Sequence, residues 1–327
     1  MEYREIGSTG IKTSPVCLGT WAIGGGPWWG ASDDKESIRA IQAALDEGIN
    51  FIDTAPAYGF GRSEEIVGSA IAGRRDSVVI ATKCGLWWSG TEGEPFFEMD
   101  GYDVRRSLKP ETIRAEVEQS LKRIGTDYID LLITHWQEPG PDKTPIEVTM
   151  DCLEQLRKEG KIRAIGASNL SPEELVEYTR HGTLDVIQEH YSMLHRDLEK
   201  THRDLALRDS VGIMAYTVLE QGLLSGKITM DSVFEKDEFR NQIPWFQPDK
   251  RAQVIKLLES WKGLTEKYDC TPAQLVIAWT FSQPGITWAV SGARKVSHAL
   301  ENARAAELVL EDADVTYLRE SVESLEQ

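Results

Sequence analysis

The sequence predicts an α/β fold, a single (β/α)8 TIM barrel with extra helices and long loops over its C-terminal face. Eight short apolar runs alternate with amphipathic stretches along the 327 residues. Apolar strands joined by helices are typical of a parallel sheet that is covered on both faces. Eight such units favour a closed barrel over an open doubly wound sheet. No change of composition marks a boundary, so we expect one domain over residues 1–327.

The expected strands are short runs rich in Val, Ile and Ala, and in chain order they cover residues 16–20, 51–54, 78–82, 128–134, 163–167, 186–188, 211–216 and 288–290. The first expected helix, residues 35–47, carries Ile38, Ile41 and Leu45 at helical spacing. Gly48 follows, where a helix would stop. The next helix, residues 63–71, has Ser63 as its expected N-cap.

Further helices are expected at residues 111–123, 146–159, 172–179 and 198–207. Two more helical stretches, 249–282 and 312–325, exceed what a minimal barrel needs. Two connections, 84–108 and 225–249, are too long for simple loops and are rich in aromatic residues. Long loops in compact domains are usually functional, so we expect these two to lie over the active face.

The chain has 36 basic and 53 acidic residues, a net charge of −17. This acidity argues against nucleic acid or an anionic membrane as the main partner. The four scattered cysteines indicate reduced thiols in a cytoplasm. No basic and apolar leader begins the chain, and no apolar run approaches the roughly 20 residues of a membrane span. We therefore expect a cytoplasmic monomer or homo-oligomer whose partner is a small molecule.

Polar and aromatic residues follow most of the expected strands. In a (β/α)8 barrel the active site lies at the C-terminal ends of the strands, so these side chains should converge there. They are Thr20, Trp21, Asp53, Lys83, His135, Trp136, Ser168, Asn169, Gln188 and Tyr216, with Tyr58 in the loop after the second strand.

Four of these residues have acid–base chemistry. A tyrosine has a reference pKa near 10, and an adjacent lysine ammonium lowers the pKa of its phenol. Asp53 would keep Lys83 charged and in place beside Tyr58, and a histidine at position 135 can hydrogen-bond a carbonyl oxygen or relay a proton. Each residue alone is explained as well by capping, ion pairing or packing. Their joint arrangement favours a site that protonates a carbonyl oxygen while a hydride reaches the carbon.

Four motifs, in this order, are specific. They are GINFIDTAPAYG at 48–59 with GRSEE at 61–65, KIRAIGASN at 161–169, Tyr216 with QGLLSGK at 221–227, and SGARK at 291–295 with Glu301 and Asn302. Through them the chain resembles the aldo-keto reductase superfamily over essentially its whole length. It is most similar to the bacterial branch related to general stress reductases.

The resemblance implies the site residues. Asp53, Tyr58, Lys83 and His135 match the catalytic tetrad, with Tyr58 as general acid. Ser168, Asn169 and Gln188 match the residues that hold the nicotinamide carboxamide, and Tyr216 matches the aromatic that stacks on the ring. The other implied cofactor contacts are Thr20, Trp21, Leu219, Gln221, Gly222, Leu224, Gly226, Lys227, Gly292, Arg294, Lys295, His298, Glu301 and Asn302.

The expected cofactor is NADPH (NADP+). A ribose 2′-phosphate needs paired donors, and Arg294 and Lys295 supply them in an otherwise acidic chain. Two stretches near the cofactor depart from the family pattern. Residues 217–219 read Thr-Val-Leu where Ser-Pro-Leu is common, and residues 189–194 read Glu-His-Tyr-Ser-Met-Leu where Pro-Tyr-Asn is more usual.

Seven of the ten tryptophans fall at expected strand ends or in the loops beyond them. Flat aromatic walls suit apolar ligands or the C–H faces of sugars. Because the same loops carry polar residues, we expect a sugar-like or small polar aldehyde as substrate, although about half of these indoles would be explained by packing alone. The expected substrate contacts are Trp21, Trp29, Trp88, Trp136, Trp245 and Arg240.

Two other classes of function stay open. Some relatives bind the cofactor mainly to regulate or sense, with little turnover, and an intact tetrad does not exclude that role. A metal-dependent barrel hydrolase has no ligand set, because His181, His190, His195 and His202 show no zinc-type pairing, so no metal is expected. The natural substrate and the direction of the reaction are left open by the sequence.

Overall fold

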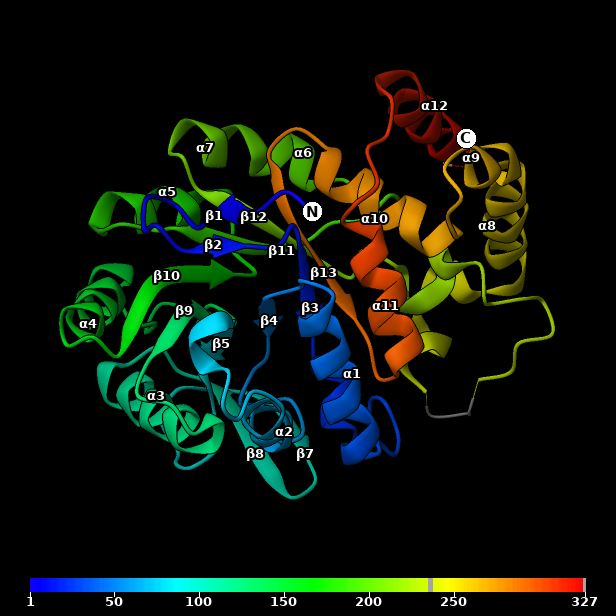
Figure 1. Ribbon diagram of the computed structural model, residues 1–327. Helices are drawn as coiled ribbons and strands as arrows, with labels where there is room; N and C mark the ends of the chain where they lie inside the picture. Colours follow the sequence, from blue (N-terminus) through cyan, green and yellow to red (C-terminus); the bar gives the residue numbers. More distant parts are fainter. Residues whose placement is uncertain (235–237, 326–327) are drawn as a thin grey trace.

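The computed structural model describes residues 1–234 and 238–325 and closes the predicted barrel (Figure 1). All eight expected strands are confirmed and all pair in parallel. They are β3 (Val16–Gly19), β4 (Phe51–Asp53), β5 (Val79–Cys84), β9 (Ile129–Thr134), β10 (Ile162–Ser168), β11 (Val186–His190), β12 (Gly212–Tyr216) and β13 (Ile286–Gly292).

The strand register places the C-terminal strand ends at one mouth of the barrel. Gly19 pairs with Asp53, and Ser168 pairs with Gln188. Lys83 pairs with Ile133, two residues before His135. Side chains far apart in the sequence therefore meet at the same end.

The outer layer consists of helices that alternate with the strands. They are α1 (Asp34–Asp46), α2 (Arg62–Ala70), α3 (Pro110–Ile124), α4 (Ile146–Lys158), α5 (Pro172–His181), α6 (Leu198–Thr201), α7 (Arg203–Arg208) and α11 (Val296–Ala305). Asp33 caps α1, and Ser171 forms a capping box with Glu174 at the start of α5. Helix α11 was not anticipated in the sequence.

The expected N-cap role of Ser63 is wrong. Gly61, with φ 99°, is the N-cap of α2, and Ser63 lies within the first turn. Its hydroxyl instead hydrogen-bonds the Thr20 hydroxyl at 2.8 Å and the Thr20 carbonyl at 3.1 Å. Ser63 thus ties α2 to the end of β3.

The expected extra helices form α8 (Pro248–Ser260), α9 (Lys262–Lys267), α10 (Pro272–Ser282) and α12 (Asp312–Glu323). Figure 1 shows α8, α9 and α12 grouped beside the barrel. Helix α10 contacts both α11 and β13, and all but its first and last residues are buried, which explains its apolar sequence. No helix in the described part of the chain is long and apolar enough to cross a bilayer.

The N-terminal end of the barrel is closed by a short hairpin, β1 (Arg4–Glu5) and β2 (Lys12–Thr13). Beneath it, the buried Trp288 indole donates to the Thr13 hydroxyl at 2.7 Å. The same indole packs edge-on against Phe51, with ring centroids 5.9 Å apart. We refer to this closed end as the floor and to the opposite end as the mouth.

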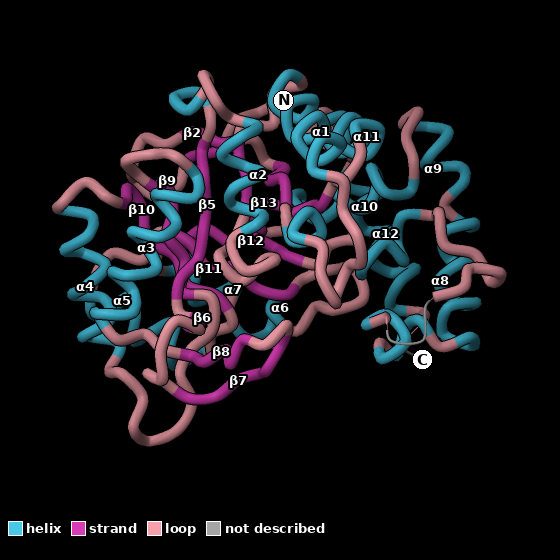
Figure 2. The backbone as a smooth tube through the Cα atoms, turned by 90° about the horizontal axis from the view of Figure 1, so that it is seen from below, coloured by secondary structure: helices cyan, strands magenta, loops and turns pink. Residues whose placement is uncertain are grey.

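The first long connection folds into an antiparallel sheet of three strands, β6 (Leu86–Trp87), β7 (Glu94–Met99) and β8 (Tyr102–Arg106), in the order β6-β8-β7. Figure 2 shows β7 and β8 at the end of the molecule opposite the N-terminus. The second long connection contains short 3-10 turns η4 (Phe239–Gln242) and η5 (Pro244–Phe246). Residues 235–237 of this connection lie outside the described part. Three further 3-10 turns are η1 (Trp21–Gly24), η2 (Arg75–Ser77) and η3 (Glu220–Ser225).

Candidate active site

A buried ion pair lies at the centre of the mouth. Lys83 of β5 donates from Nζ to Asp53 Oδ1 of β4 at 2.7 Å, and also to the Thr54 carbonyl at 2.9 Å. The two side chains are 1% and 5% exposed. Burial by itself lowers the pKa of Lys83, but the Asp53 carboxylate and then Tyr58 together more than offset it, so the pKa is raised. Lys83 is therefore a fixed cation.

Tyr58 lies in the loop after β4, with its ring 4.8 Å from Lys83 Nζ. Burial raises the pKa of the phenol to about 12, because it outweighs the opposing effect of Lys83. The expectation that lysine would lower this pKa below its usual value is thus wrong in the net direction. Tyr58 consequently holds its proton throughout the physiological range and is available as a donor.

His135 follows β9 and lies edge-on to Tyr58, with ring centroids 5.8 Å apart. Its backbone N–H donates to the Cys84 carbonyl at 2.8 Å, which fixes its position next to β5. Burial, and then the charge of Lys83, hold the pKa of His135 well below its usual value. A neutral imidazole can hydrogen-bond a carbonyl oxygen without competing with Tyr58 as the acid.

The residues expected at the nicotinamide form a continuous network. Gln188 donates to the same Asp53 oxygen as Lys83, at 2.8 Å. The Ser168 hydroxyl donates to the Gln188 carbonyl at 2.6 Å. Asn169 donates to the His135 carbonyl at 2.8 Å and accepts from the Tyr216 hydroxyl at 2.7 Å. The amide groups of this network thus adjoin the tetrad.

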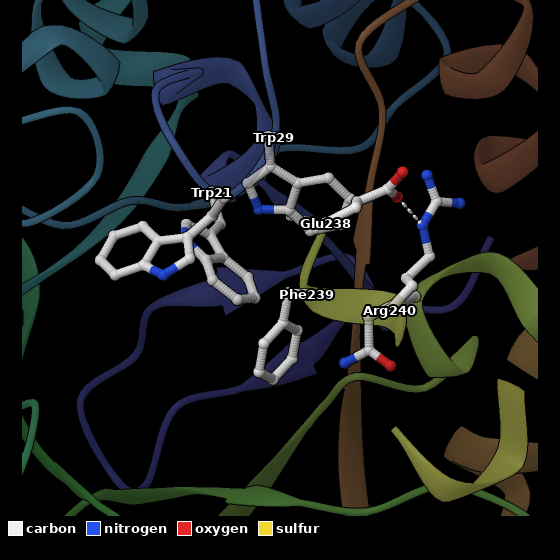
Figure 3. A pocket seen from close by; sticks show the side chains of 7 residues that line it. Trp21, Trp29, Glu238, Phe239 and Arg240 are labelled. Carbon is white, nitrogen blue, oxygen red and sulfur yellow. Dashed lines mark hydrogen bonds and ion pairs between the residues drawn. The ribbon is translucent and has the colours of Figure 1, made fainter. Parts of the chain in front are cut away.

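A small pocket opens between the loop after β3 and the loop after β12 (Figure 3). Its lining consists of Trp21, Trp28, Trp29, Gln221, Glu238, Phe239 and Arg240. Among the described residues, Trp29 Nε1, Gln221 Oε1 and Ser291 Oγ are buried without a hydrogen-bond partner. Such orphaned groups are costly unless a ligand or water uses them. A polar, extended cofactor fits this requirement.

The loop after β12 has an unusual backbone. Thr217, Glu220 and Gln221 adopt positive φ angles of 62°, 45° and 49°, and Gly222 follows at 93°. A side-chain residue in this region costs of order 1–3 kcal/mol, and such strain clusters at ligand clamps. The loop carries Gln221 and Gly222, two of the expected cofactor contacts. Among the described residues, the atom nearest to a Cβ added at Gly222 is Ile228 Cδ1, 3.9 Å away, so there is space beside this glycine.

Both departures from the family pattern meet at this loop. Glu220 is buried, accepts from the Ser192 hydroxyl at 2.5 Å and pairs with His190 Nε2 at 3.1 Å. The His190 ring stacks on Tyr216, with centroids 5.5 Å apart. Sequence reasoning missed this contact, although the unusual residues at 190 and 192 were the available signal.

The remaining expected cofactor contacts lie after β12, at the end of β13, and at the start of and within α11. Lys227 pairs with Glu301 at 2.5 Å, and the Arg294 guanidinium donates to the Trp29 carbonyl at 3.0 Å. Asn302 donates to the Gly292 carbonyl at 3.2 Å. Burial, and then the nearby Lys227, lower the pKa of His298. Lys295 is exposed at the start of α11, Leu224 is buried, and Gly226 is exposed where a Cβ would lie 2.9 Å from Pro272.

The expected substrate contacts divide into groups. Trp21, Trp29 and Arg240 line the pocket, with Arg240 also paired to Glu238. Trp136 faces Phe96 of β7, with centroids 5.4 Å apart, and Trp88 packs on Phe60 and Tyr102. Trp245 instead packs against the hydrophobic core, with Lys250 4.6 Å from its ring. The structure does not bring Trp245 to this pocket.

The fold and these side chains define a (β/α)8 oxidoreductase. Among the described residues no group of three or more His, Cys, Asp or Glu is arranged to hold a metal. The Aldo/keto reductase family model matches residues 15–323, and the chain belongs to this family. It is therefore an oxidoreductase of carbonyl compounds that works with a nicotinamide cofactor.

Several relatives match 90% or more of the chain. The chain is 43% identical over 329 residues to the NADH-specific methylglyoxal reductase of Escherichia coli (strain K12), covering 100% of both chains. It is 42% identical over 298 residues to aldo-keto reductase YhdN of Bacillus subtilis (strain 168), covering 90% of this chain and 86% of the relative. The solved glycerol dehydrogenase of Gluconobacter oxydans superimposes with a TM-score of 0.87 at 36% identity, covering 98% and 95% of the two chains.

A Klebsiella pneumoniae aldo/keto reductase solved with NADP and acetate superimposes with a TM-score of 0.70 at 28% identity, covering 94% of this chain and 91% of that one. The relatives' names therefore include both an NADH-specific enzyme and a complex with NADP. Family membership alone leaves the choice between the two cofactors undecided.

Proposed function

We propose that this protein reduces a small polar or sugar-like aldehyde with NADPH, with Tyr58 as the general acid. The observation that carries the proposal is the position of the Lys83 cation, which Asp53 holds in place, beside a Tyr58 phenol that keeps its proton. The hydride that the carbonyl carbon receives would be supplied by a bound reduced nicotinamide. The carbonyl π bond breaks and its electron pair takes the proton of Tyr58, which yields the alcohol and a phenolate.

Each remaining residue of the tetrad has a distinct task. Lys83 lies close enough to the Tyr58 ring to stabilise the phenolate that forms, and Asp53 holds Lys83 in place. His135 remains neutral and donates a hydrogen bond to the carbonyl oxygen. Ser168, Asn169 and Gln188 would hold the carboxamide of the cofactor, with Tyr216 stacked on its ring. Solvent then returns the proton to Tyr58.

The preference for NADPH rests on Arg294, Lys295 and His298. These donors stand at the start of α11 in a chain with a net charge of −17. The name of the Escherichia coli relative points the other way. A fluorescence titration decides between them: we expect NADPH to bind at least about tenfold more tightly than NADH, because a phosphate gains paired charged hydrogen bonds. Equal affinities would overturn the preference.

The substrate class is supported by the pocket and by the relatives. The pocket combines indoles with a few polar groups, and the relatives named for methylglyoxal and glycerol act on small polar compounds by their names. A panel of sugars, short aldehydes and diketones with NADPH tests this proposal. Turnover confined to large apolar ketones would contradict it.

The central test replaces Tyr58 with Phe. Loss of the general acid should lower kcat by about 10²–10⁴-fold and leave the affinity for NADPH unchanged. An unchanged rate would show that Tyr58 is not the acid. If the wild-type protein binds NADPH tightly and reduces no carbonyl, a regulatory role replaces the proposed one. We also propose that residues 1–327 act as one cytoplasmic domain, as a monomer or a homo-oligomer.

A further inference from the structure

Aromatic side chains form a continuous chain of ring contacts that begins at Tyr58 and ends at Trp136. Starting from Tyr58, neighbouring ring centroids lie 6.2, 6.0, 5.5, 5.3 and 5.4 Å apart, and the last residue directly follows His135. We name this group of side chains the aromatic collar. In order from Tyr58, it consists of Trp21, Trp28, Phe97, Phe96 and Trp136. Two of its members, Phe96 and Phe97, come from β7 of the added sheet.

Among the described residues, one cation lies against an aromatic ring of the collar. The guanidinium of Arg106, from β8, lies 4.7 Å from the centre of the Phe96 ring. Its Nε is buried without a hydrogen-bond partner, and no described carboxylate lies within ion-pair distance of it. Glu94 is its cross-strand neighbour in the register, yet the two side chains form no ion pair. An unpaired arginine is unexpected in a chain with a net charge of −17.

The preceding arginine shows the contrast. Arg105 donates from Nε to Asp103 at 2.9 Å and from Nη1 to the Gly93 carbonyl at 2.8 Å. Successive residues of a strand point to opposite faces, so the two arginines serve different sides of the sheet. The hydrogen bonds of Arg105 stabilise the sheet. The guanidinium of Arg106, on the side of Phe96, still has an N–H donor without a partner.

We propose that Arg106 binds a carboxylate carried by the carbonyl substrate. This inference rests on the proposed function, and it narrows the substrate to aldehydes that bear an anionic group at the far end of an apolar spacer. The aldehyde lies at Tyr58, the spacer lies against the collar, and the carboxylate takes the planar fork of the guanidinium. Arginine is suited to this task because its donors match a carboxylate bidentately.

The experiment compares acids with their neutral amides. The probes are 4-formylbenzoate against 4-formylbenzamide, and 4-oxobutanoate against 4-oxobutanamide, so that two spacer lengths are sampled. For the wild-type protein the acid should have the higher kcat/KM in at least one pair. In Arg106→Gln this acid-to-amide ratio should fall at least about fivefold, since one charge-assisted contact is lost. The kcat/KM for the amide should stay unchanged.

Arg105→Gln is the matched control, because it removes the same charge from the next residue of the same strand. The acid-to-amide ratio of Arg105→Gln should stay within about twofold of the wild-type ratio if a direct contact with Arg106, and not the overall electrostatic potential, causes the preference for acids. Arg106→Lys should retain part of the ratio. A wild-type ratio of one or less for both pairs, or an equal fall in both Gln variants, would overturn the inference.

The proposed function and this inference fail separately. If neutral aldehydes are reduced and acids gain nothing through Arg106, only the carboxylate site is wrong. If no aldehyde is reduced at all, the carbonyl reductase proposal fails. The carboxylate site is then tested by the binding of 4-formylbenzoate. The collar indoles report on that binding: 4-formylbenzoate should quench tryptophan fluorescence at lower concentration than the amide, and Arg106→Gln should abolish the difference.

Discussion

Asp53 and Asp130 are both buried aspartates paired with cations, but they lie at opposite ends of the barrel. Asp53, at the mouth, receives Lys83 and Gln188 on one oxygen, Oδ1. Asp130, near the floor at the start of β9, uses both oxygens: Oδ1 accepts from Arg163 and Oδ2 accepts from Arg75, each at 2.7 Å.

The two networks also lead to different neighbours. Asp130 additionally accepts the Ile80 backbone N–H at 3.0 Å, so its network joins β5, β9 and β10 to each other. The Asp53 network leads to Tyr58, whose phenol carries a displaced pKa. The same buried carboxylate thus secures strand ends at the floor and holds a reactive group at the mouth. In barrels of this class the two ends divide stability and catalysis in this way.

The strongest way to break this comparison is Lys83→Met. Removal of the cation leaves Tyr58 without a partner for its phenolate, so kcat/KM for aldehyde reduction should fall by about 10³-fold or more, or ~4 kcal/mol. Steady-state kinetics with NADPH measure the loss, and a cofactor titration should remain within a few-fold of the wild type. A rate within about tenfold of the wild type would mean that the mouth pair is merely structural.

The converse change is Asp130→Asn. It leaves Arg75 without its carboxylate at a buried position, so the free energy of unfolding should fall by about 2–3 kcal/mol. Urea unfolding measures this, while kcat/KM should stay within about twofold. Asp46→Asn is the control: its pair with Arg74 is exposed, so its loss should cost under about 0.5 kcal/mol. A large loss of activity in Asp130→Asn would end the division between mouth and floor.

Glu116 provides a test of whether a buried carboxyl near the mouth lowers the free energy of unfolding. This carboxyl, on α3, accepts the Gly85 N–H at 2.8 Å, and burial raises its pKa to about 8. Its contribution to stability is present below the unfolded value of about 4.5 and is lost as the pH rises towards 8. Glu116→Gln should therefore be more stable than the wild type at pH 8.5, by about 2 kcal/mol, and equal to it near pH 4.5.

Urea unfolding at pH 4.5, 7 and 8.5 measures this difference. Glu118→Gln, on the exposed side of the same helix, should show no such pH dependence. A Glu116→Gln variant that is destabilised equally at all three pH values would contradict this prediction. It would show that the folded protein holds Glu116 as a charged carboxylate.

The smallest expected effect is a change in KM, and it distinguishes tryptophans that line the pocket from tryptophans that pack against the core. Trp21 lines the pocket and lies 6.2 Å from Tyr58, so Trp21→Phe should raise KM for the aldehyde by about three- to tenfold. Trp245 packs against the core, and Trp245→Phe should leave KM within about twofold. If Trp245→Phe has the larger effect on KM, the second long connection closes over the substrate after all.

The sequence predicted the strands and the location of the tetrad because both depend on local patterns. An apolar run ends, a polar residue follows, and barrel closure brings those ends together. It could not place Ser63, because Gly61 takes the N-cap position and the Ser63 hydroxyl bonds Thr20 at the end of the neighbouring strand β3. Nor could it pair β6, β7 and β8, since the pairing of short polar strands depends on contacts with the rest of the mouth.

Other parts of the site needed tertiary information. The contact of His190 with Glu220 joins two segments 30 residues apart, and the unusual residues at 189–194 do not by themselves show what His190 contacts. The direction of the Tyr58 pKa shift depends on how far burial outweighs Lys83. The adjacent arginines at 105 and 106 differ only through the faces on which they lie.

The sheet of β6, β7 and β8 begins and ends at the same point of the barrel. The Ser107 N–H donates to the Gly85 carbonyl at 3.2 Å, so the two ends of residues 86–106 are one hydrogen bond apart. Such a segment is a natural unit of exchange for protein engineering. A graft of a different hairpin between Gly85 and Ser107 would change the aromatic collar and Arg106 together, while the strand that carries Lys83 stays as it is. Selectivity can thereby diversify independently of the reaction.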